Sequence, residues 1–312
     1  MKKQKIEINK PYTLDEGYDE FILSCKVRNL RESTIKSYDE RIRTIYKFIN
    51  PKTPIESINK STVDSFILFM QNELNIKEIT MNTYLRAFRT ILYYFMKMGY
   101  MKDFKISELK YDKPLIELYT DAEIKILLKK PNKNKCNFSE FRNWVICNVL
   151  YGTGIRCANI LNLKNEDIDL QNNLMYLRTT KNRKPLILPI CKSLHDILKE
   201  YMLIRKGSDD DYLFCSQYGN KMTRNSITSA MRLYNHNRGI VKTGIHRWRH
   251  SFTSAYIKGH GDVFKLQKIL NHNTIQSTQN YVHLFTNDLQ TDMQDNNPLE
   301  KILNTNKSIK MR

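Results

Sequence analysis

Apolar residues recur at helical spacing through the first hundred residues, and this period restricts the region to a packed set of helices. The pattern predicts four helices. The first begins at a capping box formed by Thr13 and Glu16, and the last begins at Thr80 and ends at Gly99. The last helix has the clearest buried stripe, formed by Met81, Tyr84, Leu85, Phe88, Ile91, Leu92 and Phe95. We therefore expect residues 1–100 to form a helical domain.

Two of these helices, one after Ser33 and one after Thr80, carry small polar and basic side chains opposite their apolar stripes. Such groups suit a DNA groove and its phosphates, and an ordinary solvated helix face is the alternative. The candidate DNA-binding residues are Thr34, Lys36, Ser37, Arg41, Asn82, Thr83, Arg86 and Arg89.

The remaining chain changes character twice. Residues 101–117 lack a helical period, contain Pro114 and are expected to form a linker. Apolar helices then follow a capping box at Thr120 and Glu123, and "NNLMYLRTTKNRKPLILPI" alternates around a basic turn, which predicts a β-hairpin. The stretch "DYLFCS" is expected to add a short edge strand. We expect residues 118–290 to be mainly α with a small antiparallel β-sheet.

The charge of the chain favours a polyanionic partner. Lys and Arg total 51 against 32 Asp and Glu, a formal net charge of +19, and nucleic acid is the commonest large polyanion. The six cysteines form no CxxC pair, which favours reduced thiols. No stretch has the length and apolarity of a membrane span or a secretory signal, so we expect a cytoplasmic protein without a membrane partner.

Four short stretches of the second region together carry a reactive set of side chains. They are "GTGIR", the hairpin turn, "HRWR" and "HNTIQSTQNY", and the candidate catalytic residues in them are Arg156, Lys181, His246, Arg249, His272 and Tyr281. This set resembles the tyrosine recombinase, or phage integrase, family. The family pattern is an arginine in G-[TL]-G-[LI]-R, a lysine in a β-hairpin, H-x-x-R, and a histidine nine residues before a tyrosine.

The resemblance implies a role for each residue type. Tyr281 would attack the phosphodiester and form a 3′-phosphotyrosine, while the two arginines clamp the non-bridging oxygens. Lys181 would protonate the leaving 5′ oxygen. His246 would accept the tyrosine proton or hold the phosphate, and His272 would donate to a phosphate oxygen. This chemistry needs no metal or cofactor. Each residue also has an ordinary structural explanation when it is taken alone.

Three positions depart from the family pattern. Asn159 stands where the family often has an acidic residue, so it can hydrogen-bond the arginine region but supplies no charge. Asn271 replaces the usual glycine before the second histidine, and asparagine tolerates the left-handed conformation. Trp248 replaces a more usual leucine. None of these changes removes a catalytic group.

The resemblance implies a minimal two-domain site-specific recombinase, with a SAM-like core-binding domain at 1–100 and a catalytic domain at 118–290. It would act as a tetramer on double-stranded DNA with specific recombination sites, through a four-way junction. An accessory factor or a second recombinase is a further expected partner, and the tail at 291–312 is expected to dock on a neighbouring protomer. Integration or excision of a mobile element is the expected purpose. The alternatives are a Xer-like dimer-resolving recombinase, a type IB topoisomerase and a non-catalytic DNA-binding protein.

Overall fold

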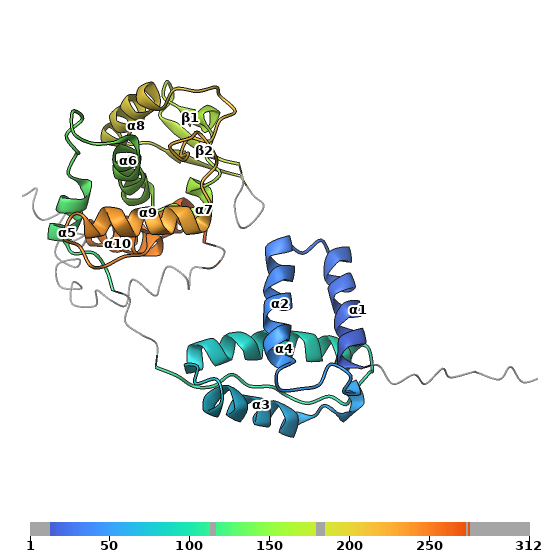
Figure 1. Ribbon diagram of the computed structural model, residues 1–312. Helices are drawn as coiled ribbons and strands as arrows, with labels where there is room; N and C mark the ends of the chain where they lie inside the picture. Colours follow the sequence, from blue (N-terminus) through green and yellow to red (C-terminus); the bar gives the residue numbers. More distant parts are fainter. Residues whose placement is uncertain (1–12, 113–116, 179–184, 273, 275–312) are drawn as a thin grey trace, which may run out of the picture. The chain divides into compact units, whose positions relative to one another are not determined.

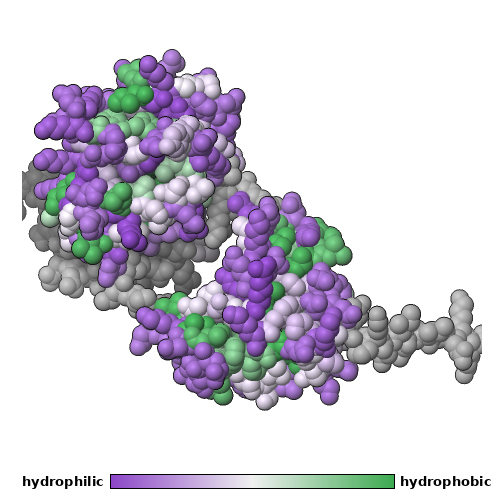
Figure 2. Space-filling model, in the orientation of Figure 1, coloured by the Kyte–Doolittle hydropathy of each residue, from purple (hydrophilic) through white to green (hydrophobic). Residues whose placement is uncertain are grey.

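A computed structural model of the chain describes residues 13–112, 117–178, 185–272 and 274. The chain divides into two compact units, Met1–Pro114 and Leu115–Arg312. Figure 2 shows hydrophilic residues over most of the visible face of each unit, with hydrophobic residues gathered in separate patches. Within the described ranges, no helix is long and apolar enough to cross a membrane.

The first unit is helical, as its apolar period predicts. Its elements are α1 (Leu14–Val27), α2 (Glu32–Ile45), the 3₁₀ turn η1 (Ile55–Ser57), α3 (Lys60–Asn72) and α4 (Glu78–Lys97). In Figure 1, α1 and α2 run side by side, and α4, which contacts α1, α2 and α3, crosses below them. The predicted capping box of Thr13 and Glu16 is present, and Gly99 follows α4 with a positive φ of 77°.

The segment after α4 belongs to the first unit, which corrects the prediction that 101–117 is simply a linker. Met101 and Ile106 are buried in the first core, and Phe104 and Leu109 pack against it. These apolar side chains anchor the segment although it has no helical period. The division between the units, at Pro114, lies inside the predicted linker.

Asn82 holds this segment in place. Its Nδ2 donates to the Leu109 carbonyl and its Oδ1 accepts from the Leu109 N–H, both at 2.8 Å, and the Asn82 side chain is fully buried. The sequence prediction placed Asn82 on an exposed DNA-binding face. The structure instead gives its amide two internal partners, because the extended segment at 106–111 covers this part of α4.

We expect Asn82→Ala to lower the free energy of unfolding of the first unit by about 1–3 kcal/mol, since it leaves the backbone polar groups of Leu109 without partners. Urea unfolding followed by circular dichroism measures this change. The control is Thr90→Ala, an exposed residue of the same helix, which should stay within about 0.5 kcal/mol of wild type. Equal stability of Asn82→Ala and Thr90→Ala would show that the Asn82 amide does not hold the segment.

The second unit is built around one buried helix. Its elements are α5 (Asp121–Leu128), α6 (Phe138–Thr153), α7 (Cys157–Ile160), η2 (Asn165–Asp167), β1 (Ile168–Asp169), β2 (Leu174–Leu177), β3 (Leu186–Pro189), α8 (Lys192–Arg205), α9 (Arg224–His236), α10 (Ile245–Lys258) and α11 (Val263–Leu270). α6 contacts α5, α8, α9 and α10, which surround it in Figure 1. Residues on nearly every side of α6 are buried, most of them apolar, together with the polar Arg142, Asn143 and Thr153.

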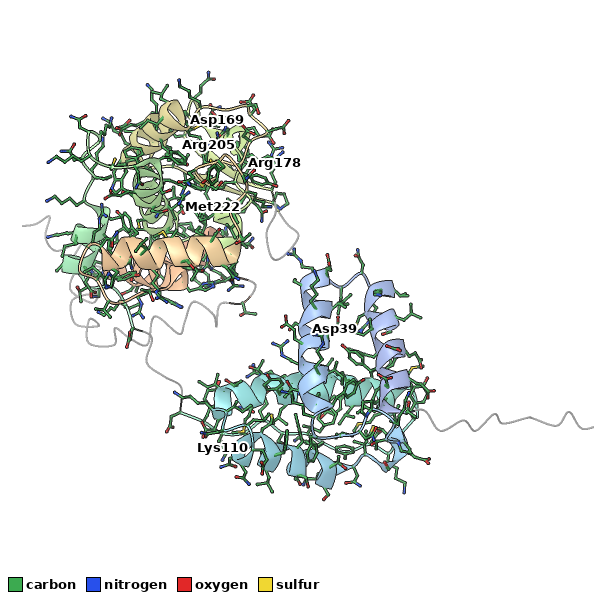
Figure 3. The ribbon with its side chains drawn as sticks, in the orientation of Figure 1. Asp39, Lys110, Asp169, Arg178, Arg205 and Met222 are labelled. Atoms are coloured by element: carbon green, nitrogen blue, oxygen red, sulfur yellow. The ribbon has the colours of Figure 1, made fainter. Side chains whose placement is uncertain are left out.

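A three-stranded antiparallel sheet has the order β1-β2-β3. The predicted hairpin is confirmed, with Leu174 opposite Pro189 and Leu177 opposite Leu186. Arg178, which follows β2 and is labelled in Figure 3, donates from Nε to Asp167 Oδ1 at 2.6 Å and ties the hairpin to η2.

The predicted edge strand in "DYLFCS" is wrong. Tyr212 and Cys215 make isolated bridges only, and β1 supplies the third strand. Leu213 and Phe214 are both fully buried, so the stretch fills the core instead of alternating between two faces of a sheet.

Candidate active site

Arg249 lies at the centre of the candidate site. It is on α10, is 6% exposed and bonds two backbone carbonyls from different parts of the unit. Nη1 donates to the Gly154 carbonyl and Nη2 to the Leu270 carbonyl, both at 2.7 Å. Its guanidinium therefore holds the end of α6 and the end of α11 against α10.

Gly154 lets the end of α6 pack closely against Arg249 and its neighbours. It ends α6 with a φ of 64°, a left-handed conformation that favours glycine. A Cβ there would also collide with the Phe252 ring and approach Leu270. The sharp turn at Gly154 is followed, after one intervening residue, by Arg156, which is the N-cap residue of α7.

Arg156 reaches the same place from the other side. Its Nη2 donates to the Asn271 carbonyl at 3.3 Å. Asn271 directly follows Leu270, whose carbonyl accepts from Arg249. Asn271 ends α11 with a φ of 49°, as expected for an asparagine in place of glycine. Unbonded carbonyls at a helix end carry partial negative charge and attract cations. The two guanidinium groups are thereby brought close together.

His272 follows this turn and its ring faces Arg249, with Nε2 2.7 Å from Arg249 Nη2. Arginine only donates, so His272 Nε2 accepts and the ring is neutral in this arrangement. Burial, followed by the positive charges of Arg249 and Arg156, lowers the pKa of His272 to about 4. The ring therefore stays neutral near pH 7 in the free protein.

His246 is one turn before Arg249 on α10 and belongs to the same cluster. Partial burial of its ring lowers its pKa, and the charges of Arg224, Arg249 and Arg156 lower it further. Trp248, which lies between His246 and Arg249 in the sequence, points into the core instead. It is 1% exposed and packs on Tyr119 with ring centroids 4.8 Å apart, which orients α10.

Arg224 is a residue of this site that the sequence analysis missed. It is exposed, begins α9, and acts on the pKa of both His246 and Cys157. Its only local signal is its position directly after the capping residue Thr223. Its proximity to the cluster comes from the packing of α9 beside α6, which no local pattern reveals.

The structure thus brings together Arg156, His246, Arg249 and His272, which come from three helical regions. The cluster is a half-buried centre of positive charge, suited to an anion such as a phosphodiester. Two predicted catalytic residues, Lys181 and Tyr281, lie outside the described residues. The strands on both sides of Lys181 are described and pair with each other.

The predicted DNA-binding residues of the first unit, Asn82 apart, are at least partly exposed. Thr34, Lys36 and Arg86 are exposed, and Ser37, Arg41, Thr83 and Arg89 are half-buried. Lys36 pairs with Glu32 at 2.8 Å, and Arg41 donates to the Ser37 carbonyl at 2.7 Å.

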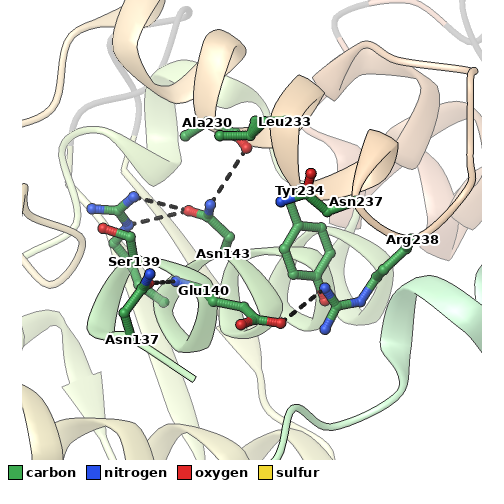
Figure 4. Close-up of a pocket in the computed structure, with 10 residues that line it drawn as sticks. Asn137, Ser139, Glu140, Asn143, Ala230, Leu233, Tyr234, Asn237 and Arg238 are labelled. Carbon is green, nitrogen blue, oxygen red and sulfur yellow. Dashed lines mark hydrogen bonds and ion pairs between the residues drawn. The ribbon is translucent and has the colours of Figure 1, made fainter. Parts of the chain in front are cut away.

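A cavity of about 480 Å³ is lined by residues at the start of α6 and by residues of α9 and the turn after it (Figure 4). Gly154 is at the other end of α6. The charged groups of the cavity already serve the fold. Arg238 pairs with Glu140 at 3.2 Å and stacks over the Tyr234 ring, and the buried Arg142 donates to Asn143 and to the Cys215 carbonyl. The cavity is therefore separate from the arginine and histidine cluster.

Each of the two units matches a known protein family model. Residues 118–288 match the model of the phage integrase family, and residues 15–111 match that of the phage integrase SAM-like domain. The tyrosine recombinase XerC of Thermodesulfovibrio yellowstonii is 25% identical over 86% of this chain and 91% of its own length. Tyrosine recombinase XerA of Pyrococcus furiosus is 29% identical over 62% of this chain and 66% of its own length.

Solved structures share the fold. The Tn1549 transposon integrase in complex with transposon right end DNA has a TM-score of 0.73 at 19% identity, covering 91% of this chain and 99% of that one. A lambda integrase tetramer bound to a Holliday junction has a TM-score of 0.70 at 15% identity, covering 88% and 78%. The family match covers more than half of the chain and includes the whole arginine and histidine cluster. The chain therefore belongs to the phage integrase family, the tyrosine-type site-specific recombinases.

Proposed function

We propose that this recombinase cuts and rejoins DNA at specific sites through a covalent bond between Tyr281 and a 3′ phosphate. The observation that carries the proposal is the convergence of Arg156 and Arg249 on neighbouring carbonyls, with His246 and His272 beside them. Two guanidinium groups at one point suit the non-bridging oxygens of a single phosphate. Their charge would stabilise the transition state of an in-line displacement.

The proposed step conserves atoms and charge. The Tyr281 hydroxyl oxygen bonds to phosphorus while the bond from phosphorus to the 5′ oxygen breaks. His246, held neutral by its lowered pKa, accepts the phenolic proton, and Lys181 supplies a proton to the 5′ oxygen. The phosphotyrosine keeps the bond energy, so a 5′ hydroxyl from another strand reverses the step without ATP.

The proposed DNA contact in the first unit is the set Thr34, Lys36, Ser37, Arg41, Thr83, Arg86 and Arg89. In the second unit, Arg224 extends the positive cluster toward the same DNA. The net charge of +19 supports binding to the DNA backbone and predicts strong salt dependence of the affinity.

The proposed assembly is a tetramer on two DNA sites that exchanges strands through a four-way junction, in the cytoplasm. The tetrameric lambda integrase structure on a Holliday junction supports this assembly. We propose that the tail at 291–312 docks on a neighbouring protomer. Its apolar residues, Leu299, Ile302 and Leu303, lie between polar stretches. An accessory factor or a second recombinase would complete the complex.

The purpose we favour is integration or excision of a mobile element, which the fold shared with the Tn1549 transposon integrase supports. Dimer resolution is the second candidate, because the XerC and XerA recombinases are similar over most of this chain. Supercoiled plasmids that carry two copies of the DNA flanking the gene test the activity. Deletion or inversion between the copies is the expected result. Relaxation without exchange would indicate a topoisomerase, and binding without any product would indicate a non-catalytic protein.

DNA binding should also take up a proton at His272. Burial, followed by the charges of Arg249 and Arg156, lowers the pKa of His272 to about 4 in the free protein. A phosphate next to the two arginines offsets their charges, so this pKa is higher in the complex. A group with the higher pKa in the bound state favours binding at low pH. We expect the affinity to fall as pH rises from about 4, the pKa in the free protein, to the higher pKa of the complex, by up to about tenfold per pH unit for one proton.

Dissociation constants measured across this pH range check the prediction. His272→Gln should flatten the pH dependence, while His195→Gln, which changes a histidine of α8 paired with Asp196, should leave it unchanged. An equal slope in wild type and His272→Gln would assign the proton uptake to other groups.

A further inference from the structure

Glu108 bridges two arginines that the sequence assigns to DNA. Its Oε2 accepts from Arg86 Nε at 3.0 Å and its Oε1 accepts from Arg89 Nη2 at 3.1 Å. The two arginines are three residues apart, so they lie on one face of α4. Each carboxylate oxygen accepts a hydrogen bond from one guanidinium group. Arg86, Arg89 and Glu108 together carry a net charge of +1.

The backbone at Glu108 is fixed by contacts that do not involve the carboxylate. Asn82 makes two hydrogen bonds to Leu109, the next residue. Two residues earlier, the buried Ile106 donates its N–H to the Tyr93 hydroxyl at 3.2 Å. Lys110, labelled in Figure 3, lies in the same extended segment. The Glu108 side chain can therefore swing away while the segment stays in place.

We infer that Arg86 and Arg89 form a seat for one phosphate of the DNA backbone, and that Glu108 occupies this seat in the free protein. A phosphodiester presents two non-bridging oxygens and one negative charge, as a carboxylate does, so it can take over the same two donors. The inference rests on the proposed function only in naming DNA as the ligand.

The exposure of the pair agrees with an exchangeable contact. The Arg86, Arg89 and Glu108 side chains are 49%, 31% and 35% exposed, so water and ions reach the ion pairs and each is weak. The two guanidinium groups lower the pKa of Glu108, which keeps its carboxylate ionised near neutral pH. Glu108 thus competes with DNA as an anion that is always near the seat, and a DNA phosphate must displace it.

Glu108→Gln tests the inference, because it removes the competing charge and keeps the size of the side chain. We expect the dissociation constant for a duplex of the flanking DNA to decrease roughly 3- to 10-fold, the scale of two exposed ion pairs. Fluorescence anisotropy at fixed salt measures it. Glu56→Gln is the matched control, since it makes the same charge change in the same unit at an exposed residue without an ion pair among the described residues. It should stay within about twofold of wild type.

A double-mutant cycle locates the effect. Arg86→Gln with Arg89→Gln should weaken binding, and adding Glu108→Gln to that background should give no further gain. If the arginine variants weaken binding but Glu108→Gln equals Glu56→Gln, the seat binds DNA and Glu108 does not compete for it, which overturns the inference. Weaker binding by Glu108→Gln would overturn it too, because Glu108 would then position the arginines for DNA.

The inference also fails if the arginine variants bind as wild type does, since the seat would then not contact DNA. That result would leave the proposed reaction intact as long as the protein still forms its covalent adduct. If wild type forms no adduct, but the Glu108 and arginine variants change DNA affinity as expected, the proposed reaction is refuted and the phosphate seat is supported.

Discussion

Tyr281→Phe is expected to abolish strand exchange, with a loss on the order of 10⁴-fold or more, because it removes the only atom that can bond to phosphorus in the proposed step. DNA affinity should stay within about twofold of wild type, since a single hydroxyl adds little to a contact dominated by phosphates. Plasmid recombination and anisotropy on the same preparations measure the two quantities.

Tyr218→Phe is the control for this variant. Tyr218 is 80% exposed, and its substitution should leave both exchange and binding unchanged. Substantial exchange by Tyr281→Phe would show that a different residue attacks the phosphate. Equal losses in both variants would point to damage to the preparation and not to the nucleophile.

Arg156→Ala and Arg249→Ala are each expected to slow cleavage by about 10²- to 10³-fold, the effect of losing one donor to a transition-state oxygen. Arg249 also holds the Gly154 and Leu270 carbonyls, so its alanine variant should have a lower melting temperature as well. Arg249→Lys separates the two effects, because lysine keeps the charge but lacks the planar fork of donors. Single-turnover cleavage of a nicked duplex measures the rate.

Arg247→Ala is the matched control on the same helix. Arg247 pairs with Glu117 at 2.7 Å and is not one of the residues that meet at the turn after α11. Its loss should change the cleavage rate by less than about threefold. A rate for Arg156→Ala as high as that for Arg247→Ala would remove Arg156 from the phosphate site.

The sequence predicted the parts of this molecule that depend on local pattern. The capping boxes of α1 and α5 are present, the apolar stripe of α4 is buried, and the hairpin pairs as its alternation indicated. His246 and Arg249 of the H-x-x-R motif both lie on α10, and Asn271 takes the left-handed conformation that asparagine tolerates. Each of these features is decided by residues within one or two helical turns of each other.

Features that depend on distant contacts were not predictable in this way. Asn82 has the polarity of a surface residue, and only the segment at Leu109, 27 residues later, gives it buried partners. The sequence around Leu213 and Phe214 has the composition of a strand, but α8 and the rest of the core bury both side chains. The charge of Arg224 acts on His246 of the candidate site because α9 packs on α6, and the local sequence around Arg224 does not reveal this packing.

Covalent trapping on a suicide substrate tests whether Tyr281 is the nucleophile. Wild-type protein is incubated with nicked duplexes cut from the DNA flanking the gene, quenched in SDS, and the protein–DNA adduct is digested for peptide mapping. We expect an adduct whose DNA is attached to the peptide that contains Tyr281, and which survives a chelator. An adduct attached to any other residue, or tight binding to a duplex with no adduct on any flanking DNA, would show that Tyr281 is not the nucleophile of the reaction proposed here.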